Sequence, residues 1–287
     1  ASILCDHDML LLKAADIIGP MHVHEIGEAG MIALGLEAGG TACILGFKRP
    51  EWVIFDVASM AIGAVPAGIY TTCSPTEVQY IIDHAEAGVV LLEDDDQWAK
   101  VKAERHNLPS LRHVVMMKGA GSIDDPLVMS WEEFLAKADA TEASEVESRV
   151  SGLQGDDLGT FIYTSGTTGP PKAVMLTHEN LAWTAKVACD LVDLNSTDTG
   201  LSYLPLSHIA EQMFSIHSPI TVGSHIYFVE SPDLLLDNLK EYRPYLLGGG
   251  AVRIAAEDTE NAERLEHGER PVVRGVHWSS RSTREDR

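Results

Sequence analysis

The 287-residue chain has a formal net charge of −22, and 45% of its residues are hydrophobic. This apolar content is sufficient for a sizeable core in one large or two ordinary domains. The excess of acidic side chains repels nucleic-acid phosphates and anionic lipid headgroups, which excludes a polyanion-binding role carried by the overall field. Any anionic ligand must therefore be held by local donors.

The cysteines are widely separated and show no paired spacing; they are Cys5, Cys43, Cys73 and Cys189. Their spacing argues against a disulfide framework or a zinc knuckle and favours a reducing compartment. Two short clusters at residues 5–8 (CDHD) and 22–24 (HVH) lack a second group of ligands at a recognised spacing. We therefore predict no metal site on this chain.

The longest uncharged run, residues 57–76, is interrupted by Pro66 and becomes polar after Tyr70. It fits a buried helix followed by a strand better than a membrane span. No secretory signal is evident at the amino terminus, so we expect a cytoplasmic protein.

The hydrophobic pattern predicts an α/β protein in which helical and extended segments alternate along the chain. Predicted helices cover residues 9–18, 51–62, 75–86, a short segment from 130, 177–192 and 234–242. Predicted strands cover residues 41–47, 64–70, 88–92, 113–117, 160–163, 201–204 and 226–229. Trp52 and Trp183 are interpreted as core or helix-packing aromatics.

Local capping signals determine several of these boundaries. Ser74 with Glu77 and Ser130 with Glu133 each form the pattern of a capping box, and Thr177 is a candidate N-cap. The acidic run 93–96 is interpreted as a solvated edge after a strand, and residues 139–157 as a connecting region. Residues 248–287 show no sustained period and are poorly specified.

A Gly/Ser/Thr-rich segment, YTSGTTGPPK, lies between a predicted strand and a predicted helix. This arrangement presents backbone N–H groups to an anion, and the helix dipole adds to the attraction. Hydroxyl donors, close-approach glycines and a mobile cation complete the predicted phosphate site: Thr164, Ser165, Gly166, Thr167, Thr168, Gly169 and Lys172. Two residues separate the glycines where a Walker A loop has four, so this is a different phosphate loop. An ordinary turn is the alternative reading of its composition.

The same string, continued through Pro170, Pro171 and Lys172, resembles the signature of the adenylate-forming acyl-CoA synthetase superfamily. Three further segments resemble long-chain fatty acyl-CoA synthetases, especially the bubblegum type: residues 46–52 (GFKRPEW), 68–75 (GIYTTCSP) and 202–212 (SYLPLSHIAEQ). The resemblance covers about residues 31–244. Ala173 replaces a usual glycine and would be strained if its backbone required a positive φ. Lys48 and Cys73 each stand where the family usually has an asparagine.

The resemblance implies an incomplete N-terminal large domain with mixed sheets flanked by helices. It also implies joining of a fatty acid to ATP, then displacement of AMP by coenzyme A, with Mg²⁺ bridging phosphate oxygens and usually peripheral membrane association. By the same resemblance, residues Thr164 to Lys172 would grip the phosphates. The expected catalytic residues are His208, Lys172 and Glu211, with His208 near the acyl carboxylate and the nucleotide. Without the motif, His208 at the start of an apolar helix would be interpreted as structural.

The family's adenine, ribose, hinge and lid motifs are not recognised in the sequence. We therefore expect a partial AMP-binding domain over residues 1–245, an atypical tail over 246–287 and no C-terminal lid domain. Such a chain is expected to be inactive alone and open to complementation by a separate C-terminal half. Two alternatives remain: another adenylate-forming ligase, and a non-catalytic nucleotide-binding or interaction fragment.

Overall fold

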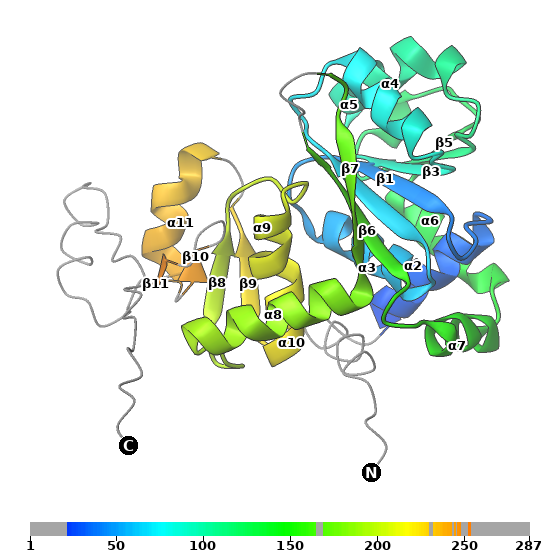
Figure 1. Ribbon diagram of the computed structural model, residues 1–287. Helices are drawn as coiled ribbons and strands as arrows, with labels where there is room; N and C mark the ends of the chain where they lie inside the picture. Colours follow the sequence, from blue (N-terminus) through cyan, green and yellow to red (C-terminus); the bar gives the residue numbers. More distant parts are fainter. Residues whose placement is uncertain are drawn as a thin grey trace, which may run out of the picture.

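The computed structural model describes residues 22–164, 169–229, 232–242, 244, 246–247 and 252–253. These residues form two sheets, one of seven strands in the order β5-β4-β3-β1-β2-β6-β7 and one of four strands in the order β11-β10-β8-β9. Helices pack around both sheets, and the smaller sheet lies beside the larger one together with α8 to α11 (Figure 1). The expectation of mixed sheets flanked by helices is confirmed.

The larger sheet is parallel except for its last pair, β6 and β7. Its strands are β1 (Thr41–Leu45), β2 (Val65–Ile69), β3 (Val89–Leu92), β4 (His113–Met116), β5 (Val128–Ser130), β6 (Leu158–Thr164) and β7 (Lys172–Thr177). Its helices are α2 (His22–Ala33), α3 (Pro50–Ala61), α4 (Pro75–His84), α5 (Asp95–Glu104), α6 (Trp131–Ala136) and α7 (Ala143–Gly152), with 3-10 turns η1 (Arg105–Asn107), η2 (Ala120–Ser122) and η3 (Lys137–Ala140).

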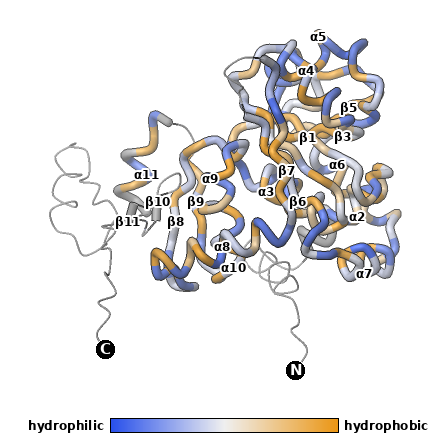
Figure 2. The backbone as a smooth tube through the Cα atoms, in the orientation of Figure 1, coloured by the Kyte–Doolittle hydropathy of each residue, from blue (hydrophilic) through white to orange (hydrophobic). Residues whose placement is uncertain are grey.

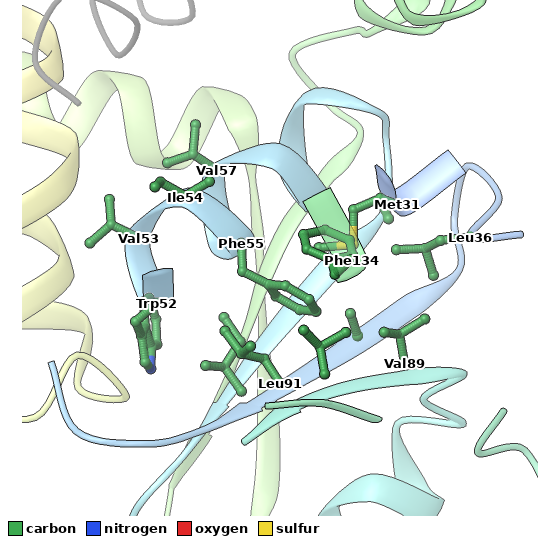
Figure 3. Packing of buried hydrophobic residues seen from close by; sticks show 14 of the residues in the cluster. Met31, Leu36, Trp52, Val53, Ile54, Phe55, Val57, Val89, Leu91 and Phe134 are labelled. Carbon is green, nitrogen blue, oxygen red and sulfur yellow. The ribbon is translucent and has the colours of Figure 1, made fainter. Parts of the chain in front are cut away.

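Alternation along β1 divides the core into two layers, because successive side chains of a strand point to opposite faces. Ala42 and Ile44 pack in one cluster with residues of α2, α3 and α6, whereas Cys43 and Leu45 pack in another with residues of α4 and α5. Figure 3 shows the first cluster, where Phe55 and the α6 residue Phe134 lie with ring centroids 5.9 Å apart. The backbone coloured by hydropathy shows apolar residues along β1 and β3 and a largely hydrophilic α5 (Figure 2). The sheet is therefore covered on both faces.

The smaller sheet consists of β8 (Thr199–Ser202), β9 (His225–Phe228), β10 (Leu246–Leu247) and β11 (Val252–Arg253). Its neighbours are α8 (His178–Val192), α9 (Ile209–Gln212), a π-helical turn (Met213–His217), α10 (Ser218–Val222), η5 (Pro232–Leu234) and α11 (Leu235–Tyr242). Strand β10 pairs in parallel with β8. The predicted boundary at residue 245 remains a prediction, and the predicted helix at 9–18 and most of the predicted tail lie outside the described residues.

The capping signals are confirmed at three helices. Ser74 and Ser130 form complete capping boxes at α4 and α6, and Thr177 forms one with Asn180 at α8. The acidic run after β3 is solvated at Asp95 and Asp96, as expected, but it also starts α5, because the Asp94 carboxylate accepts a hydrogen bond from the Gln97 N–H. Acidic side chains in a first helical turn are favoured by the helix dipole.

Two further expectations are corrected. The segment taken as a connecting region contains helix α7, whose buried Val146 packs in the first core cluster. Trp52 is fully buried in α3, as expected, but the side chain of Trp183 on α8 is 66% exposed. Its position lies on the solvent side of α8, whereas Leu181 and Ala185 of the same helix face the core.

Within the described part of the chain, no helix is long and apolar enough to span a membrane. The same residues contain no group of three His, Cys, Asp or Glu side chains that could hold a metal ion. The two clusters considered in the sequence, residues 5–8 and 22–24, lie outside the residues whose side chains are described.

Candidate functional site

A cavity of about 520 Å³ opens at the carboxyl ends of β2 and β6. Its walls come from the segment after β2, from α4, from the end of β6, from the start of β7 and from the start of α9. They are formed by Tyr70, Thr72, Cys73, Glu77, Ile81, Ile162, Tyr163, Thr164, Pro171, His208 and Ile209. The carboxyl ends of parallel strands are the usual location of ligand sites in open α/β sheets.

Strand register brings these segments together. Ala67 and Gly68 of β2 pair with Phe161 and Ile162 of β6, so the two strands end side by side. The turn before α9 then closes over this end, because Gly68 has no side chain to keep it away. Residues that are far apart in the sequence therefore share one cavity.

The phosphate loop is the turn of a β-hairpin, which corrects the predicted strand–loop–helix arrangement. Strand β7 returns antiparallel to β6, with Thr164 opposite Lys172 and Leu158 opposite Thr177. Helix α8 therefore begins at the far end of the hairpin, and its dipole cannot act on the loop, since this effect falls off within the first turn. Ala173 pairs with Tyr163 inside extended β7, so the suspected strain at a positive φ does not arise.

The predicted loop residues divide into three groups. Thr164 and Pro171 line the cavity, whereas Gly169, Pro170 and Lys172 are exposed beside it. Gly169 adopts a φ of 132°, a conformation that favours glycine. The other members, Ser165, Gly166, Thr167 and Thr168, lie outside the described residues.

His208 is the N-cap of α9 and faces the cavity. Its Nδ1 accepts a hydrogen bond from the Ala210 N–H at 3.1 Å. A ring nitrogen that accepts a hydrogen bond carries no proton, so the neutral ring holds its proton on Nε2. The side chain can therefore offer an N–H donor to a ligand oxygen.

Glu211 does not line the cavity, although the sequence grouped it with His208. It is fully buried on α9, where its Oε1 accepts hydrogen bonds from Ser202 Oγ at 2.6 Å, Tyr203 N at 3.1 Å and Ser215 Oγ at 3.0 Å. Burial raises the pKa of Glu211, and the two hydroxyl groups oppose that rise. The structure thus places Glu211 behind the cavity wall.

Tyr163 presents a neutral phenol at the cavity, because burial raises its pKa. His84 Nδ1 lies 2.9 Å from its hydroxyl, and the two rings meet edge to face. Tyr80 stacks on His84. Helix α4 therefore orients the last buried side chain of β6 before the loop.

The remaining polar wall combines neutral side chains with one ionised carboxylate, that of Glu77. Burial raises the pKa of Tyr70, and burial together with the charge of Glu77 raises the pKa of Cys73. The Glu77 carboxylate is occupied in capping α4, where hydrogen bonds from Ser74 lower its pKa. Among the described residues that line the cavity, none is lysine or arginine. An anion here would depend on neutral donors and on nearby Lys172.

Sequence reasoning did not place Tyr70, Thr72, Cys73 or Glu77 at the site, although it identified Glu77 as a capping residue. A signal was present, because all four lie in or directly after the segment 68–75 that carried part of the family resemblance. The segment was used to identify the family but not to locate the site.

A family model described as "AMP-binding enzyme" matches residues 28–250. The chain belongs to the AMP-binding enzyme family. Among curated relatives of this AMP-binding protein are the long-chain-fatty-acid–CoA ligases ACSBG2 of Gallus gallus, 37% identical over 221 residues, and of Homo sapiens, 36% identical over 224 residues. These alignments cover 74% and 76% of this chain and 29% and 34% of the relatives, so the chain spans about a third of their length.

Solved structures show the same fold. The N-terminal domain of FACL13 from Mycobacterium tuberculosis aligns with a TM-score of 0.64 at 21% identity, covering 79% of this chain and 54% of that one. The anthranilate CoA ligase AuaEII, solved with anthranoyl-AMP, aligns with a TM-score of 0.67 at 21% identity, covering 78% and 43%. The AMP-binding chain therefore has the architecture of these adenylate-forming ligases.

Proposed function

We propose that this chain is part of a long-chain fatty acyl-CoA ligase and that its cavity is where the fatty acid and ATP meet. The full reaction converts a fatty acid, ATP and coenzyme A to acyl-CoA, AMP and pyrophosphate through an acyl-adenylate. The observation that carries the proposal is the convergence of Thr164, Pro171 and His208 on one cavity of about 520 Å³ in a chain of the AMP-binding family. The names of the curated relatives support the fatty-acid class.

The residues have distinct proposed roles. A carboxylate is a weak nucleophile, so the first step depends on aligning it with the α-phosphate and stabilising the departing pyrophosphate. We assign the alignment to the Nε2–H of His208, which is free to donate, and the β- and γ-phosphates to the hairpin loop from Thr164 to Lys172. Lys172 would supply the positive charge that the cavity wall lacks.

The chemistry of the nucleotide implies Mg²⁺, which neutralises phosphate charge in such reactions. The described residues offer no group of three His, Cys, Asp or Glu side chains that fits this ion. The family resemblance supports four further proposals. They are the use of coenzyme A as a co-substrate, complementation by a separate C-terminal half, peripheral membrane association and a domain division at residue 245.

Thermal unfolding with and without Mg·ATP tests the nucleotide site. A ligand that binds only the folded state raises the midpoint, and at a hundred times its Kd it adds about 2.7 kcal/mol. We expect the shift in the wild-type chain, its loss in Lys172→Ala and a reduction in His208→Ala. Lys186→Ala is the matched control, because Lys186 lies exposed on α8 and pairs with Asp190 away from the cavity.

A cooperative transition that Mg·ATP does not move would overturn the proposed nucleotide site. A shift that survives both Lys172→Ala and His208→Ala would place the nucleotide elsewhere. Non-hydrolysable acyl-adenylate analogues with a palmitoyl or a benzoyl group test the substrate class in the same assay. Stronger stabilisation by the benzoyl analogue would favour another kind of adenylate-forming ligase.

A further inference from the structure

Lys48 is a buried cation at the junction of the two sheets. It follows β1 of the larger sheet and is 3% exposed. Its Nζ donates a hydrogen bond of 2.7 Å to the carbonyl oxygen of Tyr203, the residue directly after β8 of the smaller sheet. The Phe47 ring centroid lies 3.8 Å from the same nitrogen. A single side chain thus links the carboxyl ends of strands in different sheets.

Glu211 provides the negative charge at the other end of this link. Its Oε1 accepts a hydrogen bond from the N–H of Tyr203, while Lys48 holds the carbonyl group of the same residue. Its second oxygen, Oε2, is buried without a hydrogen-bond partner. A buried carboxylate with an oxygen that lacks a hydrogen-bond partner destabilises the fold unless a positive charge lies nearby. Lys48 supplies that charge from the other side of the Tyr203 backbone, where it binds the carbonyl oxygen.

Each charge affects the other. Burial lowers the pKa of Lys48 to about 8, and the negative charge of Glu211 opposes that fall. Burial raises the pKa of Glu211, and the positive charge of Lys48 is among the influences that oppose the rise, together with the hydroxyl groups of Ser202 and Ser215. The pair is therefore coupled in the folded chain, although other hydrogen bonds contribute at Glu211.

The turn held by this pair carries His208. The N–H of His208 donates to the Pro205 carbonyl at 3.0 Å, and the N–H of Glu211 donates to the His208 carbonyl at 3.0 Å. His208 therefore lies within one turn of Glu211 and is joined to it by a backbone hydrogen bond. Lys48 and Glu211 themselves do not line the cavity.

We propose that Lys48 and Glu211 are positioning residues, which hold the turn at residues 203–211 against the larger sheet and so place His208 at the cavity. The inference rests on the proposed function for its significance in ligand binding, but its geometry is independent of any ligand. It predicts that removing the charge of Lys48 displaces His208 while the fold is retained.

The test uses the 287-residue chain with Lys48→Met, Lys48→Arg, Glu211→Gln and the Lys48→Met/Glu211→Gln double variant. The His208 Cε1–H signal in the NMR spectrum, assigned by its loss in His208→Gln, reports on position, and urea unfolding reports on coupling. Lys118→Met is the matched control, since Lys118 is half exposed and pairs with Glu93 and Asp94 rather than with a residue of the turn.

We expect the His208 signal to shift in Lys48→Met and Glu211→Gln, to recover at least partly in Lys48→Arg, and to stay unchanged in Lys118→Met. The losses in the free energy of unfolding caused by Lys48→Met and by Glu211→Gln should not sum to the loss in the double variant, as expected for residues that share a network. Mg·ATP should raise the unfolding midpoint less in Lys48→Met than in the wild-type chain.

Additive stabilities with an unmoved His208 signal would overturn the positioning role, even if Mg·ATP stabilises the wild-type chain. If Lys48→Met does not fold, an unmoved signal in both Lys48→Arg and Glu211→Gln has the same meaning. A shifted His208 signal together with non-additive losses of unfolding free energy would support the positioning role. If Mg·ATP then has no effect on the wild-type chain, the proposed function is contradicted while the positioning role stands. The two failures are thus distinguishable.

Discussion

The Cα atom of Ser207 lies only 2.8 Å from the position that a Cβ atom on Gly68 would occupy. Strand β2 and the turn before α9 approach each other this closely because residue 68 has no side chain. The contact places the neighbouring His208 over the carboxyl end of β2 and forms one wall of the cavity. The need for glycine here arises from close approach, since its φ is not positive.

Gly68→Ala should therefore destabilise the chain by roughly 1–3 kcal/mol, the usual cost of overpacking a dense interior. The new methyl group would meet the backbone of Ser207 and the Trp52 ring, neither of which is the flexible end of a side chain. Urea unfolding checks the prediction. Gly121→Ala is the control, because no atom lies within 4 Å of the place that its new methyl group would take and its φ is not positive. Equal stabilities of the two variants would contradict the close contact.

Asp56→Asn should remove part of the pH dependence of stability. Both carboxylate oxygens of Asp56 are buried without hydrogen-bond partners, and burial raises its pKa from 3.8 to about 8. Between these values the folded chain binds more protons than the unfolded chain, so the free energy of unfolding falls as pH rises. The slope for one proton is about 1.4 kcal/mol per pH unit.

Urea unfolding at pH 6.5, 7.0 and 7.5 measures this slope. Buried His217, whose pKa falls to about 4, adds a slope of the opposite sign that fades above about pH 6.5 and is common to the variant and the wild-type chain. The stability of Asp56→Asn relative to the wild-type chain should rise across the range. Asp190→Asn, at an exposed position on α8, should not change the slope. Parallel curves for Asp56→Asn and the wild-type chain would show that Asp56 is ionised in the fold.

The two tryptophans that the sequence treated alike should behave differently. Trp52→Ala should cost about 3–5 kcal/mol, because its side chain is fully buried in α3. Trp183→Ala should change the stability by no more than about 0.5 kcal/mol, because the residue is 66% exposed. Urea unfolding followed by circular dichroism compares them without relying on tryptophan fluorescence. Similar losses would mean that the exposed face of α8 is covered in solution.

Cys73 should be the first described cysteine to react with iodoacetamide in the folded chain. It is partly exposed and lines the cavity, whereas Cys43 and Cys189 are buried. Burial raises the pKa of Cys43 to about 12, and burial and the charge of Glu77 raise that of Cys73. Because the thiolate is the reactive form, labelling of Cys73 should be slow at neutral pH and faster as pH rises.

Mass spectrometry of digested chain, in a Cys5→Ser background, locates the modified positions. In urea, where all thiols are accessible, Cys43, Cys73 and Cys189 should be labelled at similar rates. Mg·ATP should slow the labelling of Cys73 if the cavity is the nucleotide site. Faster labelling of Cys43 or Cys189 in the folded chain would contradict the described burial.

Local chemistry explains which elements the sequence predicted well. A capping box joins a side chain to a backbone group three residues away, so the starts of α4 and α6 at Ser74 and Ser130 are visible in the sequence. Asp94 caps α5 by the same local chemistry, but the run of acidic residues obscured that signal. Helix α7 was missed because its polar and charged residues leave only Val146 buried.

The sequence alone determined the family, the phosphate-loop composition and several helix starts, because these depend on residues close together in the chain. Tertiary structure decided that β7 returns antiparallel to β6, that Thr164 and His208 face one cavity, and that Glu211 lies behind its wall. These relationships depend on which strands pair and how closely their turns approach. Such pairings are set by packing between distant segments, since side-chain periodicity indicates which face of a strand is buried but not which strand lies beside it.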